Sequence, residues 1–247
     1  MKSPKLIVIM PIHNVEKYLQ GAIESVIQQT YKNFKLILID DCSTDSSLEI
    51  AKSYEHLDNV TVLNNKINKG CYYTRNKGLE YVSNEEWDYF TIHDSDDVSD
   101  ITRFEKVINF LEENPKRVGC KTTTARVHYD TKEISYHEGI PRIHPMEGQA
   151  FYSKETFNNL GYFDNTKFSG DTDYVWRLEA WVHKNPTKYL FENHTECLYI
   201  CYIRPEGENL TLKFPVSGKE RQEYFQKSKQ EVNIMYSKNN FYREIFK

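Results

Sequence analysis

Alternation between short apolar runs and amphipathic stretches over the first hundred residues constrains the fold more than any other feature of the sequence. The run at residues 5–12 is almost wholly apolar, as expected of a strand buried on both faces of a parallel sheet. Further runs read as strands at residues 34–39, 60–63 and 89–93, and the segments between the runs read as helices. Strands that alternate with helices predict a mostly parallel sheet flanked by helices.

The second half of the chain predicts a smaller unit with mixed or antiparallel strands. Strands are expected at residues 118–129, 133–136, 149–153 and 198–203. Helices are expected at residues 103–113, 156–160 and 174–183, followed by a polar amphipathic helix from about Lys219. Residues 140–145 contain two prolines and are expected to form a loop.

Length and composition exclude several classes of protein. With 247 residues, 39% of them hydrophobic, the chain is long enough for one domain with a proper core. A formal net charge of −4 gives no basic field, so we expect no nucleic-acid partner. No apolar run reaches the ~20 residues that span a bilayer, and no signal peptide precedes the first strand, so we expect a cytoplasmic protein. Five scattered cysteines are unlike a disulfide framework.

Polar residues follow directly on the predicted strands. Asn14 follows the first strand, Asp41 the second, and three carboxylates within four positions, Asp94, Asp96 and Asp97, follow the fourth. In open sheets of this kind, ligands bind beyond the carboxyl ends of the strands. Clustered carboxylates repel one another unless a cation or several donors neutralise them. A site for a hard divalent ion is one interpretation, and a solvated acidic turn is the other.

A second pair of carboxylates, Asp171 and Asp173, opens the helix expected at residues 174–183. Carboxylates at a helix start gain from the helix dipole and from unpaired N–H groups. A capping role and a catalytic role therefore both remain open for this pair.

Taken together, these stretches resemble the family-2 glycosyltransferases, which are nucleotide-sugar enzymes of the GT-A fold. The resemblance extends over roughly residues 5–211 and rests on the segments 11–19, 25–31, 40–45, 68–70, 74–78, 94–97, 160–164 and 170–178. Residues 94–97, Asp-Ser-Asp-Asp, are similar to the family's Asp-any-Asp metal motif. The chain departs from the pattern at His13, where a Tyr is more usual, at Cys42, which replaces a common Gly, and at Gly170, where the family often has Glu.

The resemblance implies a GT-A fold of a single domain at residues 1–212, with a helical extension at 213–247. Residues 1–100 would bind the nucleotide-sugar, and residues 101–212 would form the acceptor half. The extension would cover the core or, alternatively, lie on a membrane surface as a peripheral contact.

Family roles are carried over to the matching residues of this chain. Donor-binding residues would be Pro11, Ile12, Asn14, Glu16, Asp41, Arg75, Asp94 and Ser95. Asp96, with Asp94 as a possible second ligand, would bind the Mn²⁺ or Mg²⁺ that bridges the donor's diphosphate, while Asp97 would support the cluster or cap a helix. Asp171 would be the general base, with Asp173 as its rival.

A later loop at residues 202–211 often supplies a metal-facing His in this family. This chain has no His there, so Glu206 or Glu208 is a substitute, and Arg204 could contact phosphate. His93 is expected to be a packing residue at the end of a strand, because hard cations prefer oxygen ligands.

The expected activity is a metal-dependent, inverting transfer of a sugar, most simply from a UDP-sugar, to a hydroxyl of a glycan or lipid-linked acceptor. A bound metal would stabilise the leaving diphosphate, and one carboxylate would take the proton of the acceptor hydroxyl. A covalent mechanism would require a second carboxylate beside the anomeric carbon, for which the sequence offers no clear candidate. The alternatives are a catalytically silent glycan- or nucleotide-binding module of the same fold and a nucleotidyltransferase.

Overall fold

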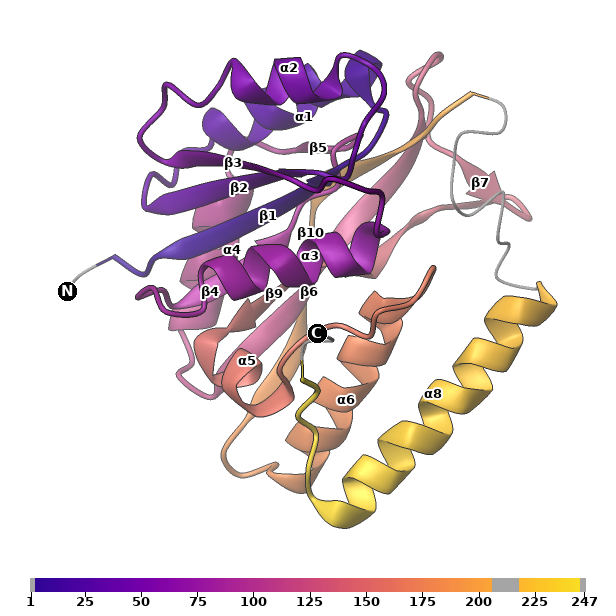
Figure 1. The fold of residues 1–247 in the computed structure, drawn as a ribbon. Coiled ribbons are helices and arrows are strands. Elements are labelled where there is room, and N and C mark those ends of the chain that lie inside the picture. The colour runs from indigo at the N-terminus through magenta and orange to yellow at the C-terminus, as the bar shows by residue number, and fades with distance from the viewer. Residues whose placement is uncertain (1–2, 206–217, 245–247) are drawn as a thin grey trace.

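The computed structural model describes residues 3–205 and 218–244, which form a central sheet with helices on both faces (Figure 1). The strands are β1 Leu6–Ile12, β2 Phe34–Asp40, β3 Val60–Asn64, β4 Tyr89–Ile92, β5 Val98–Ser99, β6 Arg117–His128, β7 Tyr136–His137, β8 Ile140–Pro141, β9 Ile143–Ser153 and β10 Leu190–Ile203. The helices are α1 Glu16–Ile27, α2 Ser47–Lys52, α3 Cys71–Tyr81, α4 Arg103–Glu112, α5 Lys154–Leu160, α6 Gly170–Lys184 and α8 Lys219–Lys238.

Eight strands form one sheet in the order β3-β2-β1-β4-β9-β6-β10-β5. Pairing is parallel from β3 through β2 and β1 to β4, and again between β6 and β10. β9 runs antiparallel between β4 and β6, and β5 pairs antiparallel with the edge of β10. The expectation of a mostly parallel sheet with a mixed second half is therefore confirmed.

Two hydrophobic cores lie on opposite faces of the sheet because successive residues of a strand point to opposite sides. In β1, Leu6, Val8 and Met10 face a core shared with α1, α2 and α4. Ile7 and Ile9 face the other core, which is shared with α3, α5 and α6. This burial on both faces explains the continuous apolar run at the start of the sequence.

The boundaries of the strands in the second half differ from the sequence prediction. The prediction of a loop at residues 140–145 is wrong, because β8 and the start of β9 lie there. Ile143 pairs with Ala125 and Pro145 with Thr123, so pairing with β6 overrides the signal of the prolines. The strand expected at 133–136 is wrong except at Tyr136, because β7 spans Tyr136–His137. β10 starts at Leu190 rather than Leu198. The sequence prediction missed its first half because that half is polar and largely exposed and contains no apolar run.

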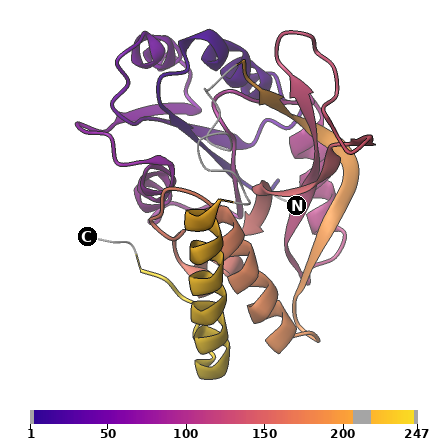
Figure 2. The ribbon, with the colours of Figure 1, turned by 90° about the vertical axis from the view of Figure 1, so that its right-hand side faces the viewer.

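The helix expected from about Lys219 is confirmed as α8, which lies along α6 (Figure 2). Its aromatic side chains face α6: Phe225 lies against Trp176, and Tyr236 against His183. These contacts are those of a helix that covers the domain, one of the two roles expected for it. Among the helices that the structure describes, none combines the length and apolar character needed to cross a membrane.

Candidate active site

The polar residues that follow β1, β2 and β4 meet at one edge of the sheet. β1 lies between β2 and β4 and is parallel to both, so Asn14, Asp41 and Asp94 all leave the sheet at the carboxyl ends of neighbouring strands. Such an edge, where the chain turns to either side of one central strand, is where α/β sheets bind ligands. The convergence expected from the sequence is therefore present in the structure.

Asn14 and Glu16 hold the loop that follows β2. The Asn14 side-chain oxygen accepts a hydrogen bond from the Thr44 backbone N–H at 2.8 Å, and Glu16 accepts one from the Ser46 N–H at 3.0 Å. Asn14 adopts a left-handed backbone conformation, φ 50°, which Asn tolerates better than most residues. Both residues are thus placed at the edge of the sheet and fix the backbone there. The preceding Pro11 and Ile12 are the last residues of β1.

Asp41 is buried and organises the start of α3. Its carboxylate accepts hydrogen bonds from the Lys69 N–H at 2.9 Å, the Gly70 N–H at 2.7 Å and the Asn65 side chain at 2.7 Å. Gly70 has φ 88°, a conformation that favours glycine. One carboxylate therefore holds the turn from which α3 presents Arg75.

Arg75 links α3 to the acidic cluster. Its Nη2 donates to Asp94 Oδ1 at 2.9 Å, and its guanidinium lies 4.8 Å from the centre of the Tyr72 ring. Arg75 is 4% exposed, yet its Nε and Nη1 have no hydrogen-bond partner among the described residues. A buried guanidinium with free donors is suited to bind an anion such as phosphate.

The three carboxylates of the cluster have different partners. Asp94 accepts from Arg75 and also from the Gln149 side chain, at 3.0 Å. Asp96 forms an ion pair with Arg204, Oδ2 to Nη2 at 2.6 Å. Asp97 is buried and accepts from the Tyr202 N–H at 2.8 Å, which ties the cluster to β10 rather than capping a helix.

Burial and mutual repulsion raise the pKa values of two carboxyl groups in the cluster. Burial raises the pKa of Asp96, and Asp94 raises it further although Arg204 lowers it. Burial and the neighbouring Asp96 and Asp94 raise the pKa of Asp97 well above its usual range. An additional cation would relieve this repulsion, so the carboxylates suit a hard divalent ion.

Side chains of the described residues do not by themselves make up a complete metal site. Within 3–205 and 218–244, no three His, Cys, Asp or Glu side chains are grouped to hold an ion. Asp94 and Asp96 supply the oxygen donors that Mg²⁺ and Mn²⁺ prefer, and Asp96 already holds a cationic group, the Arg204 guanidinium. Glu206 and Glu208, the substitutes expected for a third ligand, lie outside the described residues.

His93 and Ser95 are packed within the cluster. His93 is fully buried, with Nδ1 at 3.0 Å from the Asp94 carbonyl oxygen and Nε2 at 3.0 Å from the Ser99 hydroxyl. Burial, with a smaller effect from Arg103, lowers its pKa to about 3, so the imidazole is neutral. This is the packing role expected for His93. Ser95 is 6% exposed.

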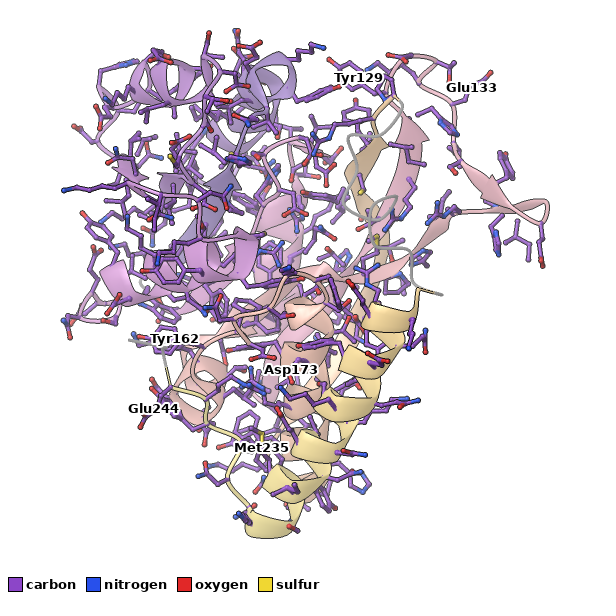
Figure 3. All side chains as sticks on the ribbon, turned by 45° about the vertical axis from the view of Figure 1, so that its right-hand side comes forward. Tyr129, Glu133, Tyr162, Asp173, Met235 and Glu244 are labelled. Carbon is purple, nitrogen blue, oxygen red and sulfur yellow. The ribbon has the colours of Figure 1, made fainter. Side chains whose placement is uncertain are left out.

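Asp171 and Asp173 lie in the first turn of α6 in contrasting surroundings. Asp171 is partly exposed, and its Oδ1 accepts from the Tyr72 hydroxyl at 2.8 Å. Asp173 is fully buried where α6 meets α8 (Figure 3). It binds Arg177 at 2.9 Å, the Ser228 hydroxyl at 2.8 Å and Arg243 at 3.3 Å. Asp173 therefore ties α6 to the C-terminal segment.

Three side chains at this edge were missed by the sequence interpretation. Gln149 binds Asp94, Tyr72 binds Asp171, and Glu147 accepts from the Thr172 hydroxyl at 2.6 Å beside Asp171. Only Tyr72 carried a local signal, because it lies three residues before Arg75 on the same helix and so shares its face. Glu147 lies in the part of β9 that was not predicted, and Gln149, at the start of the predicted strand, meets Asp94 only through the pairing of β9 with β4.

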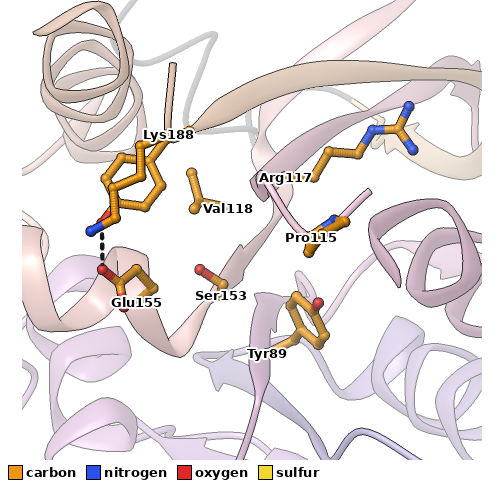
Figure 4. Close-up of a pocket in the computed structure, with 8 residues that line it drawn as sticks. Tyr89, Pro115, Arg117, Val118, Ser153, Glu155 and Lys188 are labelled. Carbon is orange, nitrogen blue, oxygen red and sulfur yellow. Dashed lines mark hydrogen bonds between the residues drawn. The ribbon is translucent and has the colours of Figure 1, made fainter. Parts of the chain in front are cut away.

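A cavity of about 350 Å³ lies at the opposite edge of the sheet, where β4 and β6 begin (Figure 4). Tyr89, Arg117, Ser153 and Lys188 are among its lining residues, and the Tyr189 hydroxyl there donates to Glu155 at 2.6 Å. None of the residues expected to bind donor, metal or acceptor lines this cavity. It is separate from the site formed by the acidic cluster and Asp171.

Known proteins resemble this chain in sequence. The family described as glycosyl transferase family 2 matches residues 7–178. The minor teichoic acid biosynthesis protein GgaB of Bacillus subtilis is 43% identical over 184 residues, covering 68% of this chain and 20% of GgaB. Glycosyltransferase GlyA of Streptococcus pneumoniae is 30% identical over 177 residues, covering 72% of this chain and 24% of GlyA. The chain thus spans a quarter or less of either relative.

Solved structures share the fold. S. aureus TarS 1–349 in complex with UDP-GlcNAc matches with a TM-score of 0.70 and 20% identity, over 93% of this chain and 66% of that one. The mannosyltransferase PcManGT of Pyrobaculum calidifontis, in complex with GDP-Man and Mn²⁺, matches with a TM-score of 0.64 and 14% identity, over 83% and 59%. The fold is GT-A, as expected. Because the family match spans well over half of the 247 residues, the chain belongs to glycosyl transferase family 2.

Proposed function

We propose that the chain transfers a sugar from a UDP-sugar to a hydroxyl of a glycan or lipid-linked acceptor, with inversion and with the aid of a divalent metal. One observation carries the proposal: contacts run without interruption from Asp94 through Arg75 and Tyr72 to Asp171. These contacts link the acidic cluster, suited to a diphosphate and its metal, with a partly exposed carboxylate suited to activate a hydroxyl.

The donor is assigned to the edge formed by β1, β2 and β4. Arg75 has two free donors for the diphosphate, and Asp94 is already held at a fixed distance from it. Pro11, Ile12, Asn14, Glu16, Asp41 and Ser95 are proposed to shape the nucleoside site, most of them by fixing the surrounding backbone. UDP as the nucleotide is supported by the structures of TarS with UDP-GlcNAc and with UDP.

Asp96, together with Asp94, would hold the metal, Mn²⁺ or Mg²⁺. Such an ion supplies a Lewis acid that stabilises the charge of the leaving diphosphate. Support comes from the burial of Asp96 and the mutual repulsion of Asp94 and Asp96, which a cation would relieve, and from Mn²⁺ in the PcManGT complex. Arg204 would have to leave Asp96 for the ion, and its guanidinium would then be free to bind a phosphate oxygen.

Asp171 would take the proton of the acceptor hydroxyl as that hydroxyl attacks the anomeric carbon. Its rival Asp173 is fully buried and bonded to Arg177, which leaves it no access to an acceptor. Glu147 is the second carboxyl group near Asp171, but burial raises its pKa, which disfavours the ionised form that a nucleophile requires. A single displacement with inversion therefore fits these residues better than a covalent intermediate.

The proposed positions of the donor site and the base also divide the chain into a donor half and an acceptor half. Donor residues lie at residues 1–100, and the base lies on α6 within residues 101–212, which we assign to the acceptor half, with residues 213–247 as an extension. GgaB is named for teichoic acid biosynthesis, which supports a hydroxyl-bearing, lipid-linked or glycan acceptor.

The proposal predicts that Asp171→Asn separates donor binding from transfer. The variant should bind UDP with Mn²⁺ as tightly as the wild type in a calorimetric titration, yet transfer sugar at least ~100-fold more slowly, because the amide cannot accept the proton. Full transfer by this variant would show that another group is the base. Failure of the wild type to bind UDP, GDP or Mn²⁺ would favour a silent module instead.

A further inference from the structure

Tyr72 occupies the space between the donor side and the proposed base. It lies on α3, is 5% exposed, and donates its hydroxyl hydrogen to Asp171 Oδ1 at 2.8 Å. The face of its ring carries the Arg75 guanidinium, 4.8 Å from the ring centre. Burial, followed by the charge of Asp171, raises the pKa of Tyr72 well above its usual range, so the phenol stays protonated and remains a donor.

The glycine that precedes Asp171 leaves room for the Tyr72 ring. A Cβ atom on Gly170 would lie 2.8 Å from Tyr72 Cδ1 and 2.9 Å from the carbonyl oxygen of Asp164. Real Cβ atoms essentially never approach neighbours so closely, so no side chain fits at this position. Residue 170 therefore offers no side chain to Asp171, and the Tyr72 ring fills the space that such a side chain would take.

The two oxygens of Asp171 are in different situations. Oδ1 accepts two hydrogen bonds, from the Tyr72 hydroxyl and from the Thr172 N–H at 3.0 Å. Oδ2 has no hydrogen-bond partner among the described residues. It faces Gly148, where an added Cβ would lie 3.0 Å away. The absence of a side chain at Gly148 leaves room beside Oδ2.

We propose that Tyr72 is the positioning residue of the base: it engages Oδ1 and so presents Oδ2 to the acceptor hydroxyl. This inference rests on the proposed role of Asp171. Tyr72 would not touch the acceptor itself. Because a small misplacement of a reacting group can lower the rate by about 100-fold, loss of one orienting hydrogen bond should act on turnover rather than on donor binding.

The test compares Tyr72→Phe with Tyr73→Phe, which removes a hydroxyl from the next residue of α3. The Tyr73 ring lies under the Lys69 ammonium group and not beside Arg75. Tyr72→Phe keeps the ring and therefore its contacts with Arg75 and Gly170. We expect kcat to fall about 10- to 100-fold with the KM for the donor and the Tm unchanged. Tyr73→Phe should match the wild type. An unchanged kcat in Tyr72→Phe would overturn the proposal, as would a fall accompanied by an equal rise in the donor KM.

A spectroscopic readout separates this inference from the proposed function. In protein with labelled tyrosine, the Tyr72 hydroxyl proton should give a slowly exchanging NMR signal that is lost in Tyr72→Phe and shifted in Asp171→Asn. If the wild type transfers no sugar from any donor while this signal is present, the proposed function fails and the hydrogen bond stands. If the signal is absent, or unaffected by Asp171→Asn, the positioning role of Tyr72 is wrong whatever the activity.

Discussion

At the scale of single residues, Arg204 and Asp96 show how the acidic cluster is balanced. The guanidinium of Arg204 lies 2.6 Å from Asp96 Oδ2, and the two side chains are each 16% exposed. Arg204 also lies over the Tyr18 ring, at 5.3 Å from its centre. Since a metal ion at Asp96 would need the same carboxylate, the pair and the metal should compete.

Arg204→Met is therefore expected to bind Mn²⁺ about 10-fold more tightly than the wild type when no nucleotide is present, because the carboxylate loses its resident cation. Isothermal titration with Mn²⁺ alone measures this affinity. Lys188→Met removes an equal charge at the cavity on the opposite edge of the sheet and should leave the affinity unchanged. Weaker Mn²⁺ binding in Arg204→Met would contradict the competition.

At the scale of elements, the first turn of α6 serves two purposes. Asp171 and Asp173 are two residues apart, and at about 100° per residue their side chains point to nearly opposite sides of the helix. Asp171 faces α3 and β9, while Asp173 faces α8 and the C-terminal segment around Arg243. Spacing alone could not show which carboxylate is the better candidate for the proposed base, because that depends on which side of α6 is covered.

Asp173→Asn should lower the free energy of unfolding by roughly 3–5 kcal/mol, because it leaves the buried Arg177 guanidinium without its counter-charge. Urea unfolding followed by circular dichroism gives this value. Asp171→Asn, on the partly exposed side of the same turn, should cost about 1 kcal/mol or less. Similar losses in the two variants would argue against the structural role assigned to Asp173.

At the scale of the whole molecule, the sequence predicts what depends on neighbours along the chain. The apolar run ending at Ile12 and the turn at Gly70 identify β1 and the start of α3, and the family resemblance adds the GT-A fold. Contacts between distant segments were not predictable. Tyr72 and Asp171 lie 99 positions apart and Asp94 and Gln149 lie 55 apart, so each pairing is created by the packing of α6 and β9 against the first half.

The edge formed by β1, β2 and β4 is proposed to bind a nucleotide-sugar through the cluster at Asp94 and Asp96. The most direct measurement is the release of nucleoside diphosphate from a panel of UDP- and GDP-sugars with Mn²⁺, for the wild type and for Asp96→Ala. We expect the wild type to release UDP from at least one sugar donor, and Asp96→Ala to release it at least ~100-fold more slowly, because the diphosphate loses its metal. Equal release by the two proteins, or no release by the wild type from any donor, would contradict this account.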